Sequence, residues 1–268
     1  MRRREFLTAS ASIAVGIVST ATRTQAASPA GARQLFELRT YRFASMEKQQ
    51  VFEQFLEQSF VPALNRAGVE PVGVFKTLAA ENPGLKLTAD PAELRLLLPH
   101  ATMESALTLE SRLAADAAYQ TAGQAILHAV KADTAFARYD STLLLAMEGA
   151  PHLVPPPKND SRVFELRTYE SPNQERAKNK LEMFNAGEFG IFAKVGMPGV
   201  FFGGAIIGQG LPQLTYMVVH SELGEVKKNW GAFGKDPDWA KLRGGAGYED
   251  NVSKVISLFI RPGRGSQI

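Results

Sequence analysis

The sequence contains no cysteine among its 268 residues. Disulfide bonds, thiolate metal sites and cysteine nucleophiles are therefore excluded, although an exported protein could have used disulfides. Beyond the N-terminal segment, no apolar stretch approaches the roughly 20 residues that a membrane-spanning helix needs. The remaining composition is that of an ordinary globular protein, with 45% hydrophobic residues to form a core.

Familiar catalytic and nucleotide-binding motifs are also missing. The sequence has no G-x-S-x-G, no P-loop ending in Gly-Lys-Ser/Thr, no G-x-G-x-x-G after a strand and no H-E-x-x-H. The glycine-rich run at residues 203–208 falls within or after an expected strand, which favours a bulge or turn over a phosphate-binding loop. No expected helix carries two histidines one turn apart. The sequence thus indicates no metal site and no particular cofactor.

The N-terminal segment begins MRRREFL, which matches the twin-arginine export pattern R-R-x-F-L. The apolar run from Leu7 to Val18 is too short to span a bilayer, and the small residues around Ala26 resemble a cleavage region. The segment predicts a cleaved signal peptide over residues 1–27 and a periplasmic or secreted protein. The alternative is an N-terminal membrane anchor or an amphipathic helix.

Cleavage would change the charge of the protein. The segment holds four arginines and one glutamate out of the 30 Lys and Arg and 27 Asp and Glu of the whole chain. The mature chain would be close to neutral, so the basic pI belongs to the signal. We therefore expect no nucleic-acid partner and no membrane association after cleavage.

The hexamer FELRTY occurs twice, at residues 36–41 and 164–169. Each copy is followed by a helical pattern that ends at a glycine, Gly68 or Gly196, at the same spacing of 128 residues. In the second helix Glu188 interrupts the apolar stripe. Two strands, another helix and a last strand follow in each half, so both halves predict the β-α-β-β-α-β order of a ferredoxin-like unit.

The fold prediction is α+β, with two tandem ferredoxin-like repeats. The first domain is expected over residues 33–149 and the second over residues 162–263, joined by a proline-rich linker over residues 150–161. In such a unit both helices cover one face of the sheet, and the bare face needs a partner. Two copies in one chain can cover each other's bare faces.

The FELRTY strands supply the first candidate site residues. Side chains alternate along a strand, so the apolar set should cover the helices and the charged set should face the space between the two sheets. The charged set comprises Glu37, Arg39, Tyr41, Glu165, Arg167 and Tyr169. Unpaired charges there would be too unfavourable to keep. The residues either pair across strands and hold the sheets in register, or the arginines bind an anionic or carbonyl-bearing ligand.

His100 and His220 form a second matched pair, each at the end of the third strand of its half. Such a histidine commonly caps or borders a strand. Near a buried carboxylate, a neutral imidazole could instead act as a general base. Both are therefore candidate catalytic residues.

The two FELRTY strands, the helices ending in glycine and the sequence WGAFGKDPDW at residues 230–239 together resemble the NIPSNAP family. The resemblance extends over both halves, and the second half matches better. The first half has LESRL at residues 109–113 and Asp-Ala-Ala-Tyr at residues 116–119, which suggests a relaxed site or packing element. Membership implies a dimeric α+β barrel, here closed within one chain. Proteins with this architecture include cofactor-free monooxygenases, haem-binding enzymes and stress proteins, and the family itself has no settled reaction.

Three functions remain open from the sequence. The first is an exported protein that binds a small molecule between its two sheets. The second is a cofactor-independent oxygenase or isomerase that uses the strand-end histidines. The third is a non-catalytic scaffold or interaction protein whose exposed edge strands join chains, with a homo-oligomer as the partner. A pocket between the sheets would favour the first two.

Overall fold

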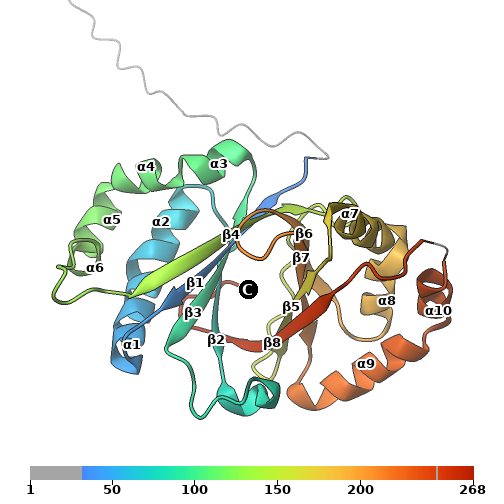
Figure 1. Ribbon diagram of the computed structural model, residues 1–268. Coiled ribbons are helices and arrows are strands. Elements are labelled where there is room, and N and C mark those ends of the chain that lie inside the picture. Colours follow the sequence, from blue (N-terminus) through green and yellow to red (C-terminus); the bar gives the residue numbers. More distant parts are fainter. Residues whose placement is uncertain (1–31, 246) are drawn as a thin grey trace, which may run out of the picture.

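Eight antiparallel strands close into a barrel in the order β1-β3-β2-β8-β5-β7-β6-β4 (Figure 1). The computed structural model describes residues 32–245 and 247–268, so the signal peptide expected over residues 1–27 lies outside it. The strands are β1 (Leu35–Arg42), β2 (Gly73–Thr77), β3 (Glu93–His100), β4 (Arg138–Ala146), β5 (Val163–Glu170), β6 (Gly199–Ile207), β7 (Gln213–His220) and β8 (Lys254–Pro262). The predicted α+β fold class is confirmed.

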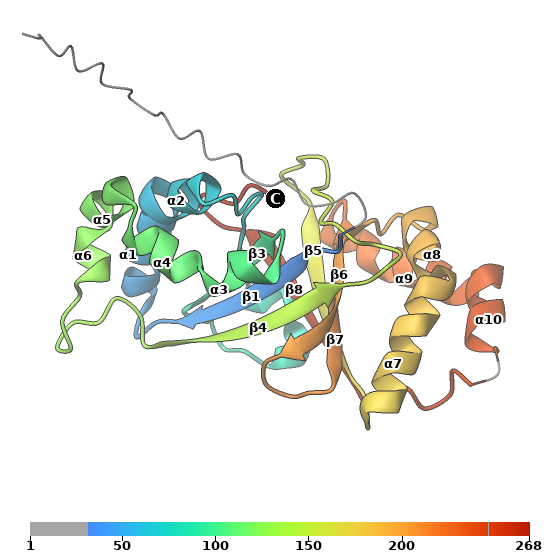
Figure 2. The same ribbon diagram turned by 90° about the horizontal axis from the view of Figure 1, so that it is seen from above.

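Helices cover the barrel on two opposite sides, α1 to α6 on one and α7 to α10 on the other (Figures 1 and 2). The α-helices are α1 (Met46–Phe55), α2 (Val61–Arg66), α3 (Met103–Leu107), α4 (Leu109–Ala114), α5 (Ala117–Ala122), α6 (Gln124–Leu127), α7 (Gln174–Met183), α8 (Phe189–Lys194), α9 (Val226–Lys235) and α10 (Pro237–Arg243). The π-helical turns are η1 (Leu56–Phe60) and η4 (Phe184–Glu188), and the 3-10 turns are η2 (Ala79–Glu81), η3 (Pro83–Leu85) and η5 (Leu223–Glu225). The single helix expected late in the first half is divided into α3 to α6.

Each half contributes four neighbouring strands to the barrel. The first half has the order β4-β1-β3-β2 and the second the order β8-β5-β7-β6. Pairing of β2 with β8 and of β4 with β6 joins the halves. Each FELRTY strand lies between two other strands of its half, so residues far apart in the sequence become its neighbours. Arg39 lies opposite Ser141, and Arg167 lies opposite Ser257.

The glycines expected to end the first helix of each half do so. Gly68 and Gly196 have φ of 74° and 82°, the left-handed conformation that favours glycine. The amide of Val69 then donates to the carbonyl of Leu64 at 2.9 Å, which closes the helix end. The π-helical turns η1 and η4 also occupy matching positions, and each inserts one residue into its helix.

The predicted direction of the FELRTY side chains is wrong. Phe36 and Phe164 point into the barrel, where they contact Phe201 and Phe75 at ring-centroid distances of 5.1 and 5.2 Å. Tyr41 and its charged neighbours lie on the outer face, beneath the helices. The reason is closure: inside the barrel the strands face only one another, so the inward positions take the Phe, Leu and Thr residues of the hexamer, whereas polar helix side chains can partner charges on the outer face.

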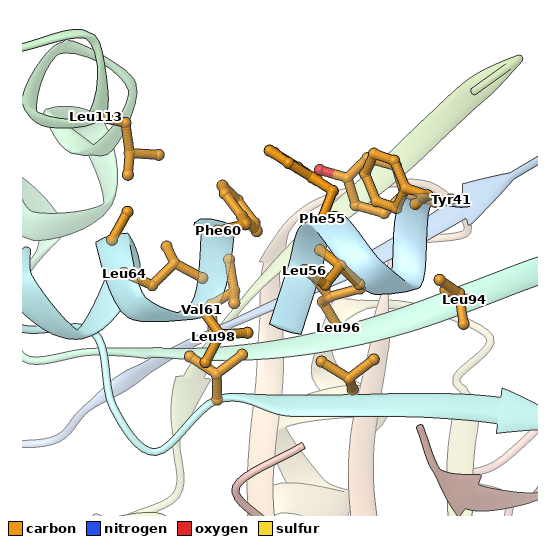
Figure 3. Close-up of a cluster of buried hydrophobic side chains, with 14 of the residues drawn as sticks. Tyr41, Phe55, Leu56, Phe60, Val61, Leu64, Leu94, Leu96, Leu98 and Leu113 are labelled. Atoms are coloured by element: carbon orange, nitrogen blue, oxygen red, sulfur yellow. The ribbon is translucent and has the colours of Figure 1, made fainter. Parts of the chain in front are cut away.

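The hydrophobic core of the first half lies between the helices and the outer face of β1 and β3 (Figure 3). Leu56 and Leu64 from the first helix pack over Leu94, Leu96 and Leu98, the outward residues of β3, and all five are fully buried. The outer face of β3 is therefore buried under the helices, and a charge placed there needs a fixed partner.

The barrel interior is closed at the end where β1 and β5 begin. Leu153 and Ile268 join the buried phenylalanines of this end, with 8% and 2% of their surface exposed. The C-terminal segment runs beside β2, where the amide of Gln267 donates to the carbonyl of Val72 at 2.8 Å. Access to the barrel interior is thus left to its other end.

Candidate functional site

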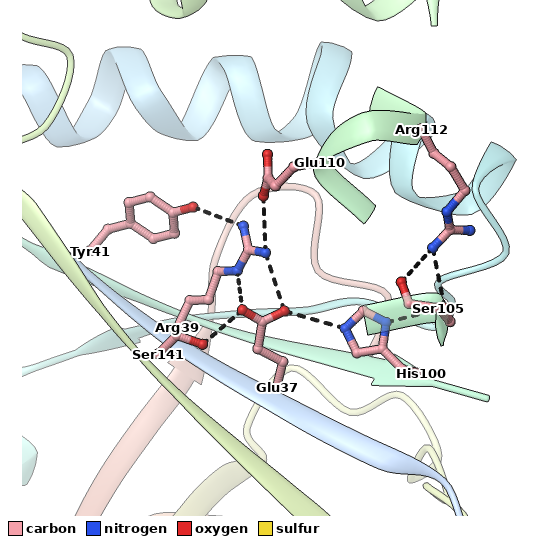
Figure 4. Close-up of polar contacts among 8 residues, drawn as sticks. All are labelled: Glu37, Arg39, Tyr41, His100, Ser105, Glu110, Arg112 and Ser141. Atoms are coloured by element: carbon pink, nitrogen blue, oxygen red, sulfur yellow. Dashed lines mark hydrogen bonds and ion pairs between the residues drawn. The ribbon is translucent and has the colours of Figure 1, made fainter. Parts of the chain in front are cut away.

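In the first half, Glu37 is the centre of a hydrogen-bond network between the sheet and the helices (Figure 4). Its carboxylate accepts from Arg39 at 2.6 Å, from Ser141 at 2.7 Å and from His100 Nε2 at 3.3 Å. Arg39 also donates to Glu110, on α4, at 3.2 Å. Its Nη1 reaches the hydroxyl of Tyr41 at 3.4 Å.

Glu165 is the centre of the equivalent network in the second half. Its carboxylate accepts from Arg167 at 2.6 Å, from Ser257 at 2.7 Å and from His220 Nε2 at 3.0 Å. Trp230 replaces the acidic residue of the first half: its Nε1 donates to Glu165 at 2.7 Å, and its ring lies 4.3 Å from the guanidinium carbon of Arg167.

The structure therefore brings together the predicted residues of each half, but not the two halves with each other. Glu37, Arg39, Tyr41 and His100 lie on one side of the barrel, and Glu165, Arg167, Tyr169 and His220 on the opposite side. The prediction that both sets face the space between the two sheets is wrong, because each set lies under the helices of its own half. The dense pairing favours the structural interpretation, in which these groups satisfy one another, and a ligand-binding role for them stays a prediction.

The two histidines are buried and bonded on both ring nitrogens. Neither has any exposed surface. His220 Nδ1 lies 3.2 Å from the side-chain nitrogen Nδ2 of Asn229, and His100 Nδ1 lies 3.3 Å from the hydroxyl of Ser105. With Asn229 as donor and Glu165 as acceptor, the proton of His220 is on Nε2. A general base must reach a substrate proton, and these nitrogens reach only protein groups.

The two central carboxylates have strongly lowered pKa values. Burial opposes ionisation of Glu165, but the hydrogen bond from His220 and the charge of Arg167 outweigh it and lower the pKa to about 2. Burial also opposes ionisation of Glu37, where the hydrogen bonds from His100 and Arg39 lower the pKa to about 2. Both carboxylates are thus ionised at every pH well above 2.

These pKa values predict a specific acid sensitivity. A carboxylate with a lowered folded pKa stabilises the fold above its unfolded pKa of about 4.5, and the contribution is lost as pH falls toward 2. Each group should contribute roughly 2–3 kcal/mol to this loss. In Glu37→Gln/Glu165→Gln, the free energy of unfolding in urea should fall less steeply between pH 5 and 2.5 than in the unchanged protein. An identical slope in both proteins would contradict the assignment.

The second half buries a further ion pair that the first half lacks. Lys180 Nζ lies 2.8 Å from Glu188, and both side chains are less than 5% exposed. Burial raises the pKa of Glu188, although the charge of Lys180 acts in the opposite direction. Phe52 and Phe60 occupy the matching positions of the first half, 128 residues earlier. The interruption of the apolar stripe by Glu188 was the sequence signal for this pair.

A cavity of about 210 Å³ lies inside the barrel, beyond the phenylalanines that close the other end. Its wall combines apolar side chains with hydroxyl groups and a few charged side chains, among them Leu38, Leu166, Thr40, Thr168, Thr215, Arg95 and Asp140. Of the predicted site residues, Arg39 alone borders this space. The sequence missed the cavity because the apolar set of FELRTY was expected to face the helices. The described residues hold no cluster of three or more His, Asp or Glu suited to a metal ion.

Residues 164–267 match the NIPSNAP family model. This region begins within β5 and contains the network of Glu165. The tandem arrangement of two such domains, with the boundaries given above, stays a prediction. No curated protein matches the chain.

Solved structures resemble the chain in fold. A provisionally assigned monooxygenase from Lactobacillus acidophilus NCFM has a TM-score of 0.56 at 10% identity, covering 88% of this chain and 98% of its own. Another from Fusobacterium nucleatum has a TM-score of 0.56 at 9% identity, covering 86% and 93%. A NIPSNAP family protein of unknown function from Agrobacterium tumefaciens covers 41% of this chain and 96% of its own, with a TM-score of 0.37 at 17% identity. At identities this low, the two matches with TM-scores above 0.5 show the fold alone.

The structure explains how the first half departs from the NIPSNAP region. Asp116 and Asp236 occur in both halves because each caps a helix: Asp116 accepts from the amide of Tyr119 in α5, and Asp236 accepts from the amides of Asp238 and Trp239 in α10. Glu110 takes the place of Trp230, and each covers the strand arginine of its half. The two halves thus differ in the side chain that contacts the strand arginine, but in both halves a helix residue covers this arginine.

In the described part of the chain, the longest apolar helices fall short of what a membrane crossing requires.

Proposed function

We propose that this chain is an exported NIPSNAP-domain protein that binds a small molecule inside its barrel, at the open end of the space between the two sheets. The observation that carries the proposal is the cavity of about 210 Å³ lined by leucine, threonine and arginine side chains. A mostly apolar hollow with a few polar groups is the usual form of a ligand site. The twin-arginine pattern supports a periplasmic or secreted location, which the described residues leave untested.

The size of the cavity limits the ligand. Drug-sized sites measure roughly 300–1,000 Å³, so 210 Å³ suits a smaller molecule. Because Leu153 and Ile268 close the opposite end of the barrel, such a molecule would enter and leave by one route. A fixed single opening favours binding of one ligand over passage through the barrel.

The two alternatives have less support. An oxygenase or isomerase using His100 and His220 would need an imidazole nitrogen open to substrate, whereas both rings are buried and bonded to protein groups. The fold shared with provisionally assigned monooxygenases does not supply that group. A scaffold that recruits partners through free edge strands loses its premise, because each of the eight described strands pairs with two neighbours. A homo-oligomer formed through another surface stays open.

Filling the cavity tests the proposal. Native mass spectrometry of protein purified from the periplasm should show a retained small molecule, and Thr168→Trp should abolish it because the indole occupies the cavity. Thr121→Trp, on the exposed face of α5, is the matched control and should retain the molecule. Leu166→Phe provides a milder change if Thr168→Trp unfolds. Equal ligand retention by the cavity variants and the control would sink the proposal.

A further inference from the structure

We infer that the ligand of the barrel cavity is a monocarboxylate and that Arg95 binds its carboxylate through two parallel N–H groups. The inference rests on the proposed function, since it names the ligand class of the same cavity. Arg95 is on β3, lines the cavity and is 18% exposed in its side chain. It is the one strand cation whose side chain points into the barrel among the residues that border this space.

The contacts of Arg95 leave one edge of its guanidinium free. Nη1 donates to Glu93 and to the hydroxyl of Thr77, both at 2.6 Å. Nε and Nη2 have no hydrogen-bond partner in the described part of the chain. These two nitrogens form the side-on edge of the guanidinium, whose spacing matches the two oxygens of a carboxylate. Because Glu93 and Thr77 fix the far edge, this donor pair is held in one orientation before a ligand arrives.

The other charges near the opening favour a single negative charge on the ligand. Glu93 pairs with Arg95, and Asp140, which also borders the cavity, pairs with Arg42 at 2.6 Å. The opening is thus balanced before a ligand enters. A dianion such as a phosphate monoester would face two carboxylates at close range, whereas a carboxylate gains two charge-assisted hydrogen bonds with half the repulsion.

The opposite wall supports one carboxylate rather than two. Thr215 holds the position on β7 that Arg95 holds on β3, since Thr40 lies opposite Arg95 and Thr168 opposite Thr215. The hydroxyls of Thr168 and Thr215 lie 2.9 Å apart and can turn toward a polar group. The leucines between the two walls suit an apolar body. A small apolar acid therefore fits better than a dicarboxylate.

The test compares acids with their neutral amides, using benzoate with benzamide and hexanoate with hexanamide. Binding to the full protein is measured by ligand-observed NMR and calorimetry. The unchanged protein should bind the acids more tightly than the amides. Arg95→Gln should weaken acid binding about tenfold or more and leave amide binding nearly unchanged. Arg264→Gln makes the same charge change at the surface, where Arg264 pairs with Glu57 away from the cavity, and should alter acid binding by less than about twofold.

The outcomes separate the inference from the proposed function. If acids and amides bind alike and Arg95→Gln changes neither, the carboxylate inference is overturned and the cavity remains a ligand site. If no probe binds the unchanged protein, the carboxylate inference is overturned as well, whereas the proposed function fails only if Thr168→Trp and Thr121→Trp retain the same ligand in native mass spectrometry. Glu93→Gln/Arg95→Gln leaves no unpaired charge, so it replaces Arg95→Gln if the single variant unfolds, with the same expected loss of acid binding.

Discussion

Replacing Glu165 by leucine is expected to lower the free energy of unfolding by about 3–5 kcal/mol, because it leaves a buried charge without its partner. The guanidinium of Arg167 is 16% exposed and its ion pair is with Glu165. Ser257, His220 and Trp230 lose their acceptor in the same step. Unsatisfied buried donors add to the loss, so this single site should be among the most sensitive on the outer face of the barrel.

Urea unfolding at pH 7 measures the effect. Glu170→Leu is the control, since Glu170 is on the same strand, is 29% exposed in its side chain and pairs with Lys254 at the surface. It should change the free energy of unfolding by less than about 1 kcal/mol. Glu37→Leu should fall between the two, because Arg39 keeps Glu110 as an exposed partner. If Glu165→Leu is no worse than Glu170→Leu, the central role of Glu165 is refuted.

The repeat made the fold predictable. Two identical hexamers, each with a helix ending at a matching glycine, indicated two similar four-stranded units, and a bare sheet face needs a partner. The direction of the hexamer side chains was not predictable in the same way. Alternation in FELRTY separates Phe36 from Glu37 but does not say which faces inward. Both faces of a barrel strand are buried here, one in the barrel and one under helices, so burial alone could not decide.

The partners of the candidate residues depend on strand register, which a single sequence does not fix. Ser257 meets Glu165 because β8 pairs with β5, and Asn229 meets His220 because α9 crosses the end of β7. Neither pairing follows from spacing along the chain. The cavity was missed for a related reason, since Arg95 borders it only once β3 is placed between β1 and β2.

Lys180 and Glu188 were within reach of sequence reasoning. A glutamate in an apolar stripe requires a nearby cation, yet positions eight apart on a regular α-helix are rotated by about 80° from each other around the axis. The π-helical turn at Phe184–Glu188, which contains Gly187 at φ 141°, inserts one residue and brings the two side chains nearly into line. Positions eight apart then lie as positions seven apart normally do. The missing signal was the inserted residue.

Lys180→Met is expected to lower the free energy of unfolding by about 3–5 kcal/mol at neutral pH, because Glu188 stays buried without its cation. The loss should shrink as pH falls. A carboxyl group with a raised folded pKa is stabilising in its protonated form, below its unfolded pKa of 4.5, and this contribution is lost as pH rises through the folded pKa. The free energy of unfolding of Lys180→Met and of the unchanged protein is measured in urea at pH 5 and at pH 7.5. The difference between the two proteins should be smaller at pH 5.

The free energy of unfolding of the double variant Lys180→Met/Glu188→Met should be within about 1 kcal/mol of that of the unchanged protein, or higher. The first half supports this expectation, since Phe52 and Phe60 fill the matching positions and are 2% and 4% exposed. A double-mutant cycle with Glu188→Met gives the coupling energy directly. Losses that simply add would mean that each side chain acts through its packing alone. A strong positive coupling would mean that the second half keeps the pair despite an apolar alternative that the same chain already uses in its first half.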